Sequence, residues 1–398
     1  MVRLAINGRF LAQSTTGVQR VAREITREID GIVSEGGSDL DVTLVCQPEA
    51  SVDALNLRSI KVKRIGGLTG QGWEQTSLPL AAKDSILLCL GNSAPVFSLV
   101  TRAPVTVMIH DLSYRYHPNA YRTAYRMGHA VLMPLMLKLA NPVITVSETE
   151  RARLSELGSD TLARKIVVAQ NGGWRDGPDA PRGDQPTPEP GYLLYVGALT
   201  HRKNLAGLLE SAARLAREDG LRLVVVGSTT HIHTHVPLML ADDVRDNVTF
   251  LGQVENTATL ADIYRGACCL VFPSFYEASP LPPLEAMHFG CPVVVSDIPS
   301  LRERCGDAAE YCDPFDVDSI VGAVRRVVHD KKRQAQLVRL GNARAALFSW
   351  RAQAESVVAA IKSLALARKG VDVGVRTRSQ PLDAQSVDAA PASRVRRA

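Results

Sequence analysis

The chain has 398 residues, of which 45% are hydrophobic and 22% are charged. These values fit a soluble globular protein, and the length predicts two domains, each with its own core. The formal net charge of +5 is modest. It does not indicate a nucleic-acid partner, and it fits an anionic small ligand or contact with an anionic membrane surface.

Cysteine usage and the N-terminal sequence indicate a cellular location. The chain contains 7 cysteines, an odd number, and most of them lie in apolar, strand-like stretches. Buried thiols in a reducing compartment explain this distribution better than disulfides do. The first residues, MVRLAINGRF, lack the apolar core of a signal peptide, and no window has the uninterrupted apolar length of a membrane span. We therefore expect a cytoplasmic protein.

The N-terminal half alternates short apolar runs with helical patterns. The runs that predict strands are Val2–Ile6, Val42–Cys46, Ile60–Arg64, Ile86–Cys89, Val105–Ile109, Val143–Val146 and Ile166–Ala169. Gly17 and Val18 open a helix that runs to about Asp30, with apolar side chains at helical spacing. A second, short helix is predicted over Trp73–Leu80. Strands that alternate with helices predict an α/β domain with a parallel sheet.

His110 and Asp111 stand at the carboxyl end of the predicted strand Val105–Ile109. An isolated histidine in such a place is usually a packed or capping residue. Strand ends are also where the sites of parallel sheets collect. Both interpretations of His110 remain open on this pattern alone.

Two helices follow the His-Asp pair. Residues 121–140 predict a helix kinked at Pro134, which either packs on the core or presents a basic face to a membrane. Ser147 then predicts the N-cap of the next helix, and Glu150, three residues later, predicts a reciprocal capping box.

A proline-rich segment sets the predicted domain limits. Residues 177–190 contain Pro178, Pro181, Pro186, Pro188 and Pro190. Such a run cannot form a helix or a central strand, so it predicts a linker between an N-terminal domain, 1–176, and a C-terminal domain, 191–348. A terminal helix is predicted over 349–368, and residues 369–398 have the composition of a disordered tail.

The C-terminal half repeats the alternation of strands and helices. Predicted strands are Tyr192–Val196, Leu221–Val226, Val248–Leu251, Cys268–Phe272, Val293–Val295 and Ala309–Cys312. Predicted helices are Leu205–Arg217, Thr259–Arg265 and a helix that begins at Pro282 and ends before Gly290.

Two cations begin one of these helices. Arg202 and Lys203 follow a strand and precede the helix Leu205–Arg217. Positive charge at a helix N-terminus opposes the helix dipole, and a bound diphosphate would remove that conflict. Solvated surface charges are the alternative interpretation.

Two glutamates flank another helix N-terminus. Glu277 lies in the loop after the strand Cys268–Phe272, and Glu285 lies in the first turn of the helix that Pro282 opens. A carboxylate there can accept hydrogen bonds from neighbouring sugar hydroxyls. Alternatively, Glu285 is simply favoured by the dipole and Glu277 is a surface charge.

The segment from Glu277 to Glu285 resembles the Glu-x7-Glu motif of retaining group-one (family 4) glycosyltransferases. The family pattern reads Glu-Gly-Phe-Gly-Leu-Pro-x-x-Glu-Ala, and Ala278 and Pro280 replace its two glycines here. HDL, NGG and GALTHRKN resemble further family segments in the family's order, and the resemblance covers about 2–367. It implies the GT-B fold, in which two Rossmann-like domains face each other across a cleft and the terminal helix packs back on the first.

The resemblance also implies roles for single residues. Glu285 would bind the donor ribose, Glu277 and His110 would contact the donor sugar, and Arg202 and Lys203 would neutralise the diphosphate. The remaining implied residues are Gly17 and Val18 at the diphosphate or acceptor, Val254 at the base, and Arg20, Asp111 and Asn171 in support.

As a whole, the resemblance implies a transferase that moves a sugar from a nucleoside diphosphate to a hydroxyl of a glycan or lipid-linked acceptor, with retention of configuration. Likeness to bacterial mannosyltransferases of polysaccharide assembly favours GDP-mannose as donor. We expect no cofactor, and no metal, although His231, His233 and His235 alternate and Asp316 and Asp318 form an Asp-x-Asp. Such an enzyme is expected to be cytoplasmic, with peripheral contact at the inner face of the plasma membrane.

Two alternatives share the predicted architecture. A nucleotide-sugar 2-epimerase would need no acceptor, and a catalytically silent sugar-nucleotide-binding subunit would explain the glycines lost at Ala278 and Pro280. A Rossmann dehydrogenase is disfavoured because the chain lacks the Gly-x-Gly-x-x-Gly fingerprint.

Overall fold

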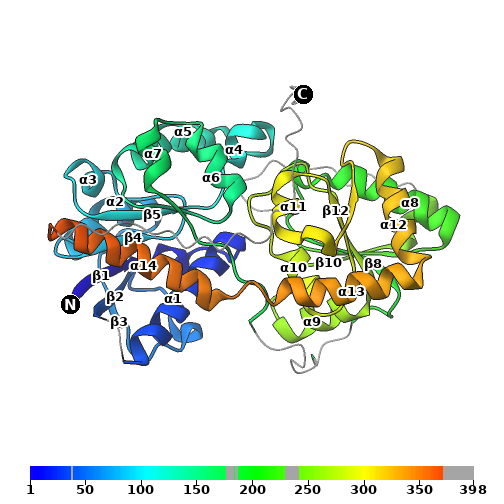
Figure 1. Ribbon diagram of the computed structural model, residues 1–398, viewed down its shortest axis with the longest axis horizontal. Coiled ribbons are helices and arrows are strands. Elements are labelled where there is room, and N and C mark those ends of the chain that lie inside the picture. Colours follow the sequence, from blue (N-terminus) through cyan, green and yellow to red (C-terminus); the bar gives the residue numbers. More distant parts are fainter. Residues whose placement is uncertain (37–38, 176–182, 184–186, 229–241, 371–398) are drawn as a thin grey trace.

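The computed structural model describes residues 1–36, 39–175, 183, 187–228 and 242–370. These residues form two parallel β-sheets, one of seven strands and one of six, each covered by helices (Figure 1). Most of the predicted linker, the histidine-rich segment around His233 and almost all of the predicted tail lie outside the described residues.

The first sheet has the strand order β3-β2-β1-β4-β5-β6-β7. Its strands are β1 (Val2–Asn7), β2 (Leu40–Cys46), β3 (Lys61–Arg64), β4 (Ile86–Cys89), β5 (Val105–Ile109), β6 (Val143–Thr145) and β7 (Ile166–Val168). Its helices are α1 (Gly17–Ser34), α2 (Gly70–Ala81), α3 (Val96–Val100), α4 (Ser113–Tyr116), α5 (Thr123–Leu139), α6 (Glu148–Ser155) and α7 (Asp160–Lys165).

The second sheet has the order β10-β9-β8-β11-β12-β13. Its strands are β8 (Tyr192–Val196), β9 (Leu223–Val226), β10 (Val248–Gly252), β11 (Ala267–Phe272), β12 (Val293–Ser296) and β13 (Glu310–Cys312). The helices that follow β8 are α8 (Leu205–Asp219), α9 (Thr257–Gly266), α10 (Pro282–His288), α11 (Pro299–Cys305), α12 (Val317–Val328), α13 (Lys331–Ala345) and α14 (Trp350–Arg368).

Short 3-10 helices fill several connections. They are η1 (Gly8–Ala12), η2 (Asp53–Leu55), η3 (Pro118–Ala120), η4 (His201–Lys203), η5 (Asp242–Asn247) and η6 (Gly306–Ala308). Of these, η4 matters for the site because it carries the two cations predicted to bind phosphate.

Alternating side chains of β1 divide the N-terminal core into two layers. Leu4 and Ile6 join the cluster that α1 and α14 cover, whereas Ala5 joins the cluster on the opposite face, which includes Trp73 of α2. Successive side chains of a strand point to opposite faces, so a sheet with helices on both sides is apolar throughout. The α14 helix, drawn in orange-red, leaves the second domain and runs across the first, where it packs against α1 (Figure 1).

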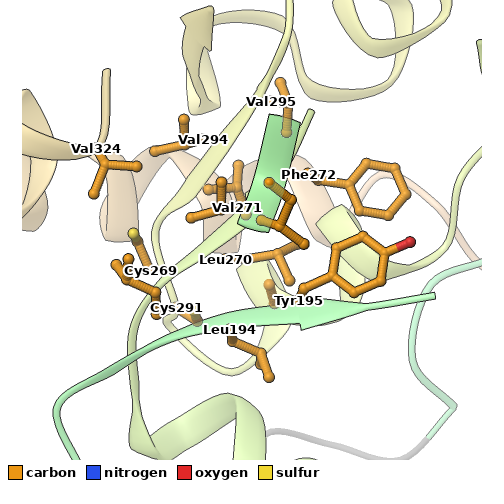
Figure 2. Close-up of a cluster of buried hydrophobic side chains, with 14 of the residues drawn as sticks. Leu194, Tyr195, Cys269, Leu270, Val271, Phe272, Cys291, Val294, Val295 and Val324 are labelled. Carbon is orange, nitrogen blue, oxygen red and sulfur yellow. The ribbon is translucent and has the colours of Figure 1, made fainter. Parts of the chain in front are cut away.

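The C-terminal core is built mainly from β8, β11 and β12. Figure 2 shows Leu194, Phe272 and Val295 among buried side chains from these strands, with Val324 contributed by α12. The continuous apolar runs of the sequence therefore correspond to strands covered on both faces. This core holds the loops after β8 and β11 in place.

The structure differs from the predicted elements mainly in short or polar helices. The sequence did not predict α3, α4 and α7, and α1 extends beyond Asp30 to Ser34. The prediction that the Glu150 side chain completes a capping box is also wrong. Ser147 caps α6 by accepting from Glu150 N at 3.1 Å, but the Glu150 carboxylate accepts from Tyr276 and Arg153 instead.

Candidate functional site

The loops after β8 and β11 meet at the place where the strand order of the second sheet reverses. In an open parallel sheet this switch point is where ligands bind, beyond the carboxyl ends of the strands. The β8 loop passes very close to the end of β9, because a Cβ on Gly227 would lie 1.9 Å from the Gly197 carbonyl oxygen. Glycine is therefore required at 227.

Arg202 and Lys203 meet Glu277 in this buried place. Lys203 Nζ lies 2.5 Å from Glu277 Oε1, and Arg202 Nη1 lies 3.5 Å from Oε2 while it donates to the Tyr276 carbonyl at 2.8 Å. The three residues are at most 9% exposed. Three residues predicted from two separate motifs thus form one cluster.

The cluster carries perturbed pKa values with clear causes. Burial raises the pKa of Glu277, but Lys203 and Arg202 outweigh burial, so its pKa lies below the ordinary range. Burial lowers the pKa of Lys203 more than Glu277 raises it. Burial also works against the charge of Arg202, yet Tyr121 and Glu277 raise its pKa overall.

The same cluster offers hydrogen-bonding capacity that the described residues do not use. Arg202 Nε and Thr200 Oγ1 are buried, and neither finds a hydrogen-bond partner among those residues. A buried donor without a partner costs about 1–3 kcal/mol. Arg202 and Lys203 share the carboxylate of Glu277 at ion-pair distance. An anionic ligand would therefore balance the excess positive charge and accept hydrogen bonds from the unused donors.

Glu285 lies in the first turn of α10, which begins at Pro282 as predicted, and it is 1% exposed. Its Oε1 accepts from Arg20 Nη1 at 2.5 Å, and its Oε2 accepts from Tyr264 Oη at 2.7 Å. The predicted ribose-binding carboxylate therefore already holds one donor on each oxygen. One of these donors, Arg20, comes from α1 of the N-terminal domain.

His110 is buried at the end of β5 and is held by the β4 loop. Its Nε2 lies 2.8 Å from the Leu90 carbonyl, and its backbone N donates to Asn92 Oδ1 at 2.6 Å. Burial lowers the pKa of His110 below the ordinary value. A neutral ring that donates from Nε2 keeps Nδ1 as a hydrogen-bond acceptor.

The other predicted N-terminal residues lie around this strand end and the start of α1. Asp111 Oδ1 accepts from Ser113 Oγ at 2.7 Å, so its oxygen is used within its own loop. Gly17 and Val18 begin α1, with nothing within 4 Å of a Cβ placed on Gly17. Val254 follows β10 and packs, partly buried, against the C-terminal core.

Asn171 lies at the junction of the two domains. Its Nδ2 donates to the Ser279 carbonyl at 3.1 Å, and its Oδ1 accepts from Gln353 of α14 at 2.9 Å. Arg304, 2% exposed, donates to the carbonyls of Asn171 and Gly172 at 2.8 and 3.0 Å. The geometry gives Asn171 a junction role, and sequence reasoning did not identify Arg304.

Sequence reasoning also missed Tyr276, Glu150 and Arg153. The Tyr276 hydroxyl donates to the Glu150 carboxylate, 3.0 Å from each oxygen, and Arg153 Nη1 lies 2.9 Å from Glu150 Oε2. The available signal was the acid–base pair one turn apart on the predicted helix, a spacing that Glu148 and Arg151 share on the same helix.

The two candidate metal motifs are the Asp-x-Asp of Asp316 and Asp318 and the alternating histidines around His233. Asp318 is exposed and pairs with Arg214, while Asp316 caps α12 by accepting from Asp318 N at 2.9 Å. His231, His233 and His235 lie outside the described residues. Within the part of the chain that is described, no group of three or more His, Cys, Asp or Glu side chains could hold a metal ion.

Solved structures define the class of fold. Sucrose-phosphate synthase from Thermosynechococcus elongatus aligns with a TM-score of 0.69 over 92% of this chain and 100% of that chain, at 20% identity. Anabaena Alr3699/HepE in complex with UDP-glucose aligns with a TM-score of 0.67 over 91% and 100%, at 14% identity. The fold is the GT-B fold of glycosyltransferases, as predicted.

The family follows from the C-terminal domain. The family described as "Glycosyl transferases group 1" matches residues 180–344, which include Arg202, Lys203, Glu277 and Glu285. This segment belongs to the group 1 glycosyltransferases, and the resemblance found in the sequence is confirmed.

Two curated relatives act on mannose according to their names. O-antigen chain mannosyltransferase B of Escherichia coli is 36% identical over 163 residues, 40% of this chain and 42% of that protein. O-antigen chain mannosyltransferase RfbU of Salmonella typhimurium is 28% identical over 249 residues, 61% of this chain and 67% of that protein. The chain thus matches less than half of the first and about two thirds of the second.

Proposed function

We propose that this chain transfers mannose from GDP-mannose to a hydroxyl of a glycan or lipid-linked acceptor, with retention of configuration, in the assembly of a cell-surface polysaccharide. The observation that carries the proposal is the buried cluster in which Arg202 and Lys203 share Glu277 at the switch point of the second sheet. Mannose as the sugar is supported by the two relatives named as mannosyltransferases.

The cluster suits the departure of a nucleoside diphosphate. As the bond between C1 of the sugar and the phosphate oxygen breaks, negative charge grows on the diphosphate, and preorganised cations at Arg202 and Lys203 stabilise it. The donor on Arg202 Nε adds a hydrogen bond that the described residues leave unused. Binding strengthens as charge develops, which is the requirement for catalysis.

Retention fits attack from the face that the diphosphate leaves. The acceptor oxygen bonds to C1, and its proton passes to the departing phosphate oxygen, so the step balances without a protein nucleophile. Glu277 is ill suited as a nucleophile, because its carboxylate is paired with Lys203 at 2.5 Å and its pKa is lowered by the cations that outweigh burial. Its proposed role is to orient the sugar, together with the acceptor Nδ1 of His110.

A groove in the N-terminal domain is the proposed place for the acceptor. It has a volume of about 920 Å³, and among its lining residues are Arg115, Arg126, Met127, Leu137, Lys138 and Lys165. The groove begins at α4, whose Tyr116 stacks on Tyr276 at 5.6 Å, one residue from Glu277. Basic and apolar walls suit an amphiphilic, anionic acceptor.

The neighbouring helix α5 gives support for a peripheral membrane location. Met127 and Val131 of α5 are 65% and 69% exposed, beside the basic side chains of the groove. Among the described residues no helix is both long and apolar enough to cross a bilayer. We propose a cytoplasmic enzyme that touches the inner face of the plasma membrane, and its 7 free cysteines fit a reducing compartment.

Donor and product analysis tests the proposal. The full chain is incubated with GDP-mannose, UDP-glucose and other sugar nucleotides, first alone and then with lipid-linked and free glycan acceptors. We expect acceptor-dependent release of GDP and an α-linked mannosyl product from the α-configured donor. Epimerised sugar nucleotide without acceptor, or binding without turnover across the panel, would contradict the proposal.

A further inference from the structure

One phenol links the two domains beside the sugar-binding loop. Tyr276 directly precedes Glu277 and is 4% exposed. Its hydroxyl accepts the N–H of Leu112 at 3.1 Å and donates to the Glu150 carboxylate, 3.0 Å from each oxygen. Leu112 and Glu150 belong to the N-terminal domain, so the residue before Glu277 is fixed by partners from the opposite domain.

Arg153 joins these residues into one unit. Its Nη1 lies 2.9 Å from Glu150 Oε2 and donates to the backbone carbonyl of Glu277 at 3.0 Å. Its guanidinium also lies 4.3 Å from the centre of the Tyr276 ring. Arg153 therefore contacts the carboxylate, the phenol and the backbone of the proposed sugar-binding residue at once.

The helix that carries Glu150 and Arg153 is itself held by the C-terminal domain. Glu303 of α11 accepts from Glu148 N at 2.7 Å and from Thr149 N at 2.8 Å. These are free N–H groups of the first turn of α6, and a carboxylate there is favoured by the helix dipole. Glu303 thus fixes α6 against the C-terminal domain at a second point.

The Tyr276 hydroxyl also joins the two loops that carry His110 and Glu277. Leu112 stands two residues after His110, and Tyr276 stands one residue before Glu277. All of these contacts cross between the two domains, so a separation of the domains would remove both partners of the hydroxyl and the bond from Arg153 to the Glu277 carbonyl. The contacts therefore hold the His110 and Glu277 loops at one spacing while the domains lie together.

We propose that Tyr276, Glu150 and Arg153 are positioning residues that act as a closure latch, which orients the Glu277 loop against the His110 loop. The proposal rests on the proposed function in that Glu277 and His110 orient the donor sugar. The latch does not touch the nucleotide. Its loss lowers the rate of transfer in the closed complex and leaves the affinity for the nucleoside diphosphate in place.

The test compares Tyr276→Phe with the wild-type chain. Phenylalanine keeps the ring against Arg153 and removes only the hydroxyl. We expect faster amide hydrogen exchange at Leu112, about tenfold lower kcat, and GDP affinity within about twofold of wild type. Tyr311→Phe is the matched control, because the Tyr311 hydroxyl donates inside the C-terminal domain, to the carbonyls of Gly306 at 2.6 Å and Leu301 at 3.5 Å.

A second variant guards against misfolding. Glu150→Gln keeps the size of the side chain and an oxygen for Tyr276, removes the charge opposite Arg153, and should show the same pattern more weakly. Unchanged Leu112 exchange in Tyr276→Phe would overturn the latch, as would a loss of kcat that parallels loss of GDP binding. If the wild-type chain transfers no sugar, the proposed function fails, and amide exchange alone still decides the latch.

Discussion

Arg20 Nη1 lies 2.5 Å from Glu285 Oε1, although 265 positions separate the two residues in the sequence. The pair joins α1 of the first domain to α10 of the second and uses the carboxylate proposed to hold the donor ribose. A carboxylate has about four acceptor positions, so Arg20, Tyr264 and a ribose hydroxyl can share it. The contact between the domains and the proposed donor binding therefore use the same carboxylate, that of Glu285.

Single substitutions can separate the contribution of Glu285 to GDP binding from the contribution of Arg20 to the contact between the domains. Glu285→Ala removes the proposed ribose contact and also leaves the partly exposed Arg20 and the buried Tyr264 without this partner, so GDP affinity should fall by about 1.5–3 kcal/mol and thermal stability should fall too. Arg20→Ala should lower stability and change GDP affinity less. Calorimetric titration with GDP and thermal unfolding measure both. Equal GDP affinity in folded Glu285→Ala and wild type would contradict the ribose assignment.

Lys203→Ala should lower turnover and weaken diphosphate binding. The change removes one of the two cations and leaves Glu277 buried with only Arg202, a loss of about 2–4 kcal/mol in transition-state stabilisation. Lys331→Ala is the control, because Lys331 begins the surface helix α13 and is exposed. Steady-state kinetics and GDP titration of both variants decide, and indistinguishable behaviour would refute the role of Lys203.

Transfer should not depend on a divalent metal. The charge that a metal would neutralise on the diphosphate is already met by Arg202 and Lys203 in the proposed site. We expect full activity after treatment with EDTA and after replacement of His231, His233 and His235 by alanine. Activity that EDTA abolishes and that manganese or magnesium restores would overturn both this expectation and the proposed arrangement of charge.

Glu150 should make stability depend on pH. Burial raises its pKa to about 7, although Arg153 on the same helix opposes the rise and the negative charge of Asp111 adds to it. Because the pKa of Glu150 is higher in the folded state, this group contributes stability that is fully present below the unfolded pKa near 4.5. The contribution is lost as the pH rises through about 7. A tenfold change in proton affinity corresponds to about 1.4 kcal/mol, so the total contribution to the free energy of unfolding is at most a few kcal/mol.

Urea unfolding between about pH 4.5 and 8 measures this contribution. The wild-type chain should lose more stability than Glu150→Gln as the pH rises, since glutamine does not titrate. Glu148→Gln, in the same first turn but half exposed, is the matched control and should follow the wild type. Parallel curves for the wild type and Glu150→Gln would show that Glu150 does not titrate in this range.

The sequence predicted both sheets because covered strands are continuous apolar runs. Val293–Val295 and Tyr192–Val196 are such runs, and glycine or proline ends the helices beside them. Short helices such as α3 and α7 escaped prediction, since too few residues are present to display a period.

Site residues were predictable where a motif is local. Arg202 and Lys203 are adjacent, and Glu277 and Glu285 lie in one loop and helix, so each pair is visible in a short window. Their partners are not. Tyr276 meets Glu150 across 126 positions, and no pattern within one segment encodes a contact that only domain packing creates. Electrostatic roles that depend on such contacts can be identified only from the three-dimensional structure.

The return of α14 to the first domain has a consequence for biosynthesis. Trp350, Ala354, Val357 and Ile361 complete the cluster that also contains Ile25 and Ile29 of α1. Synthesis runs from the N-terminus, so the first domain to leave the ribosome lacks part of its own interior until α14 has been translated. The two domains are thus completed together, and a fragment that ends before α14 would present an apolar face where this helix packs.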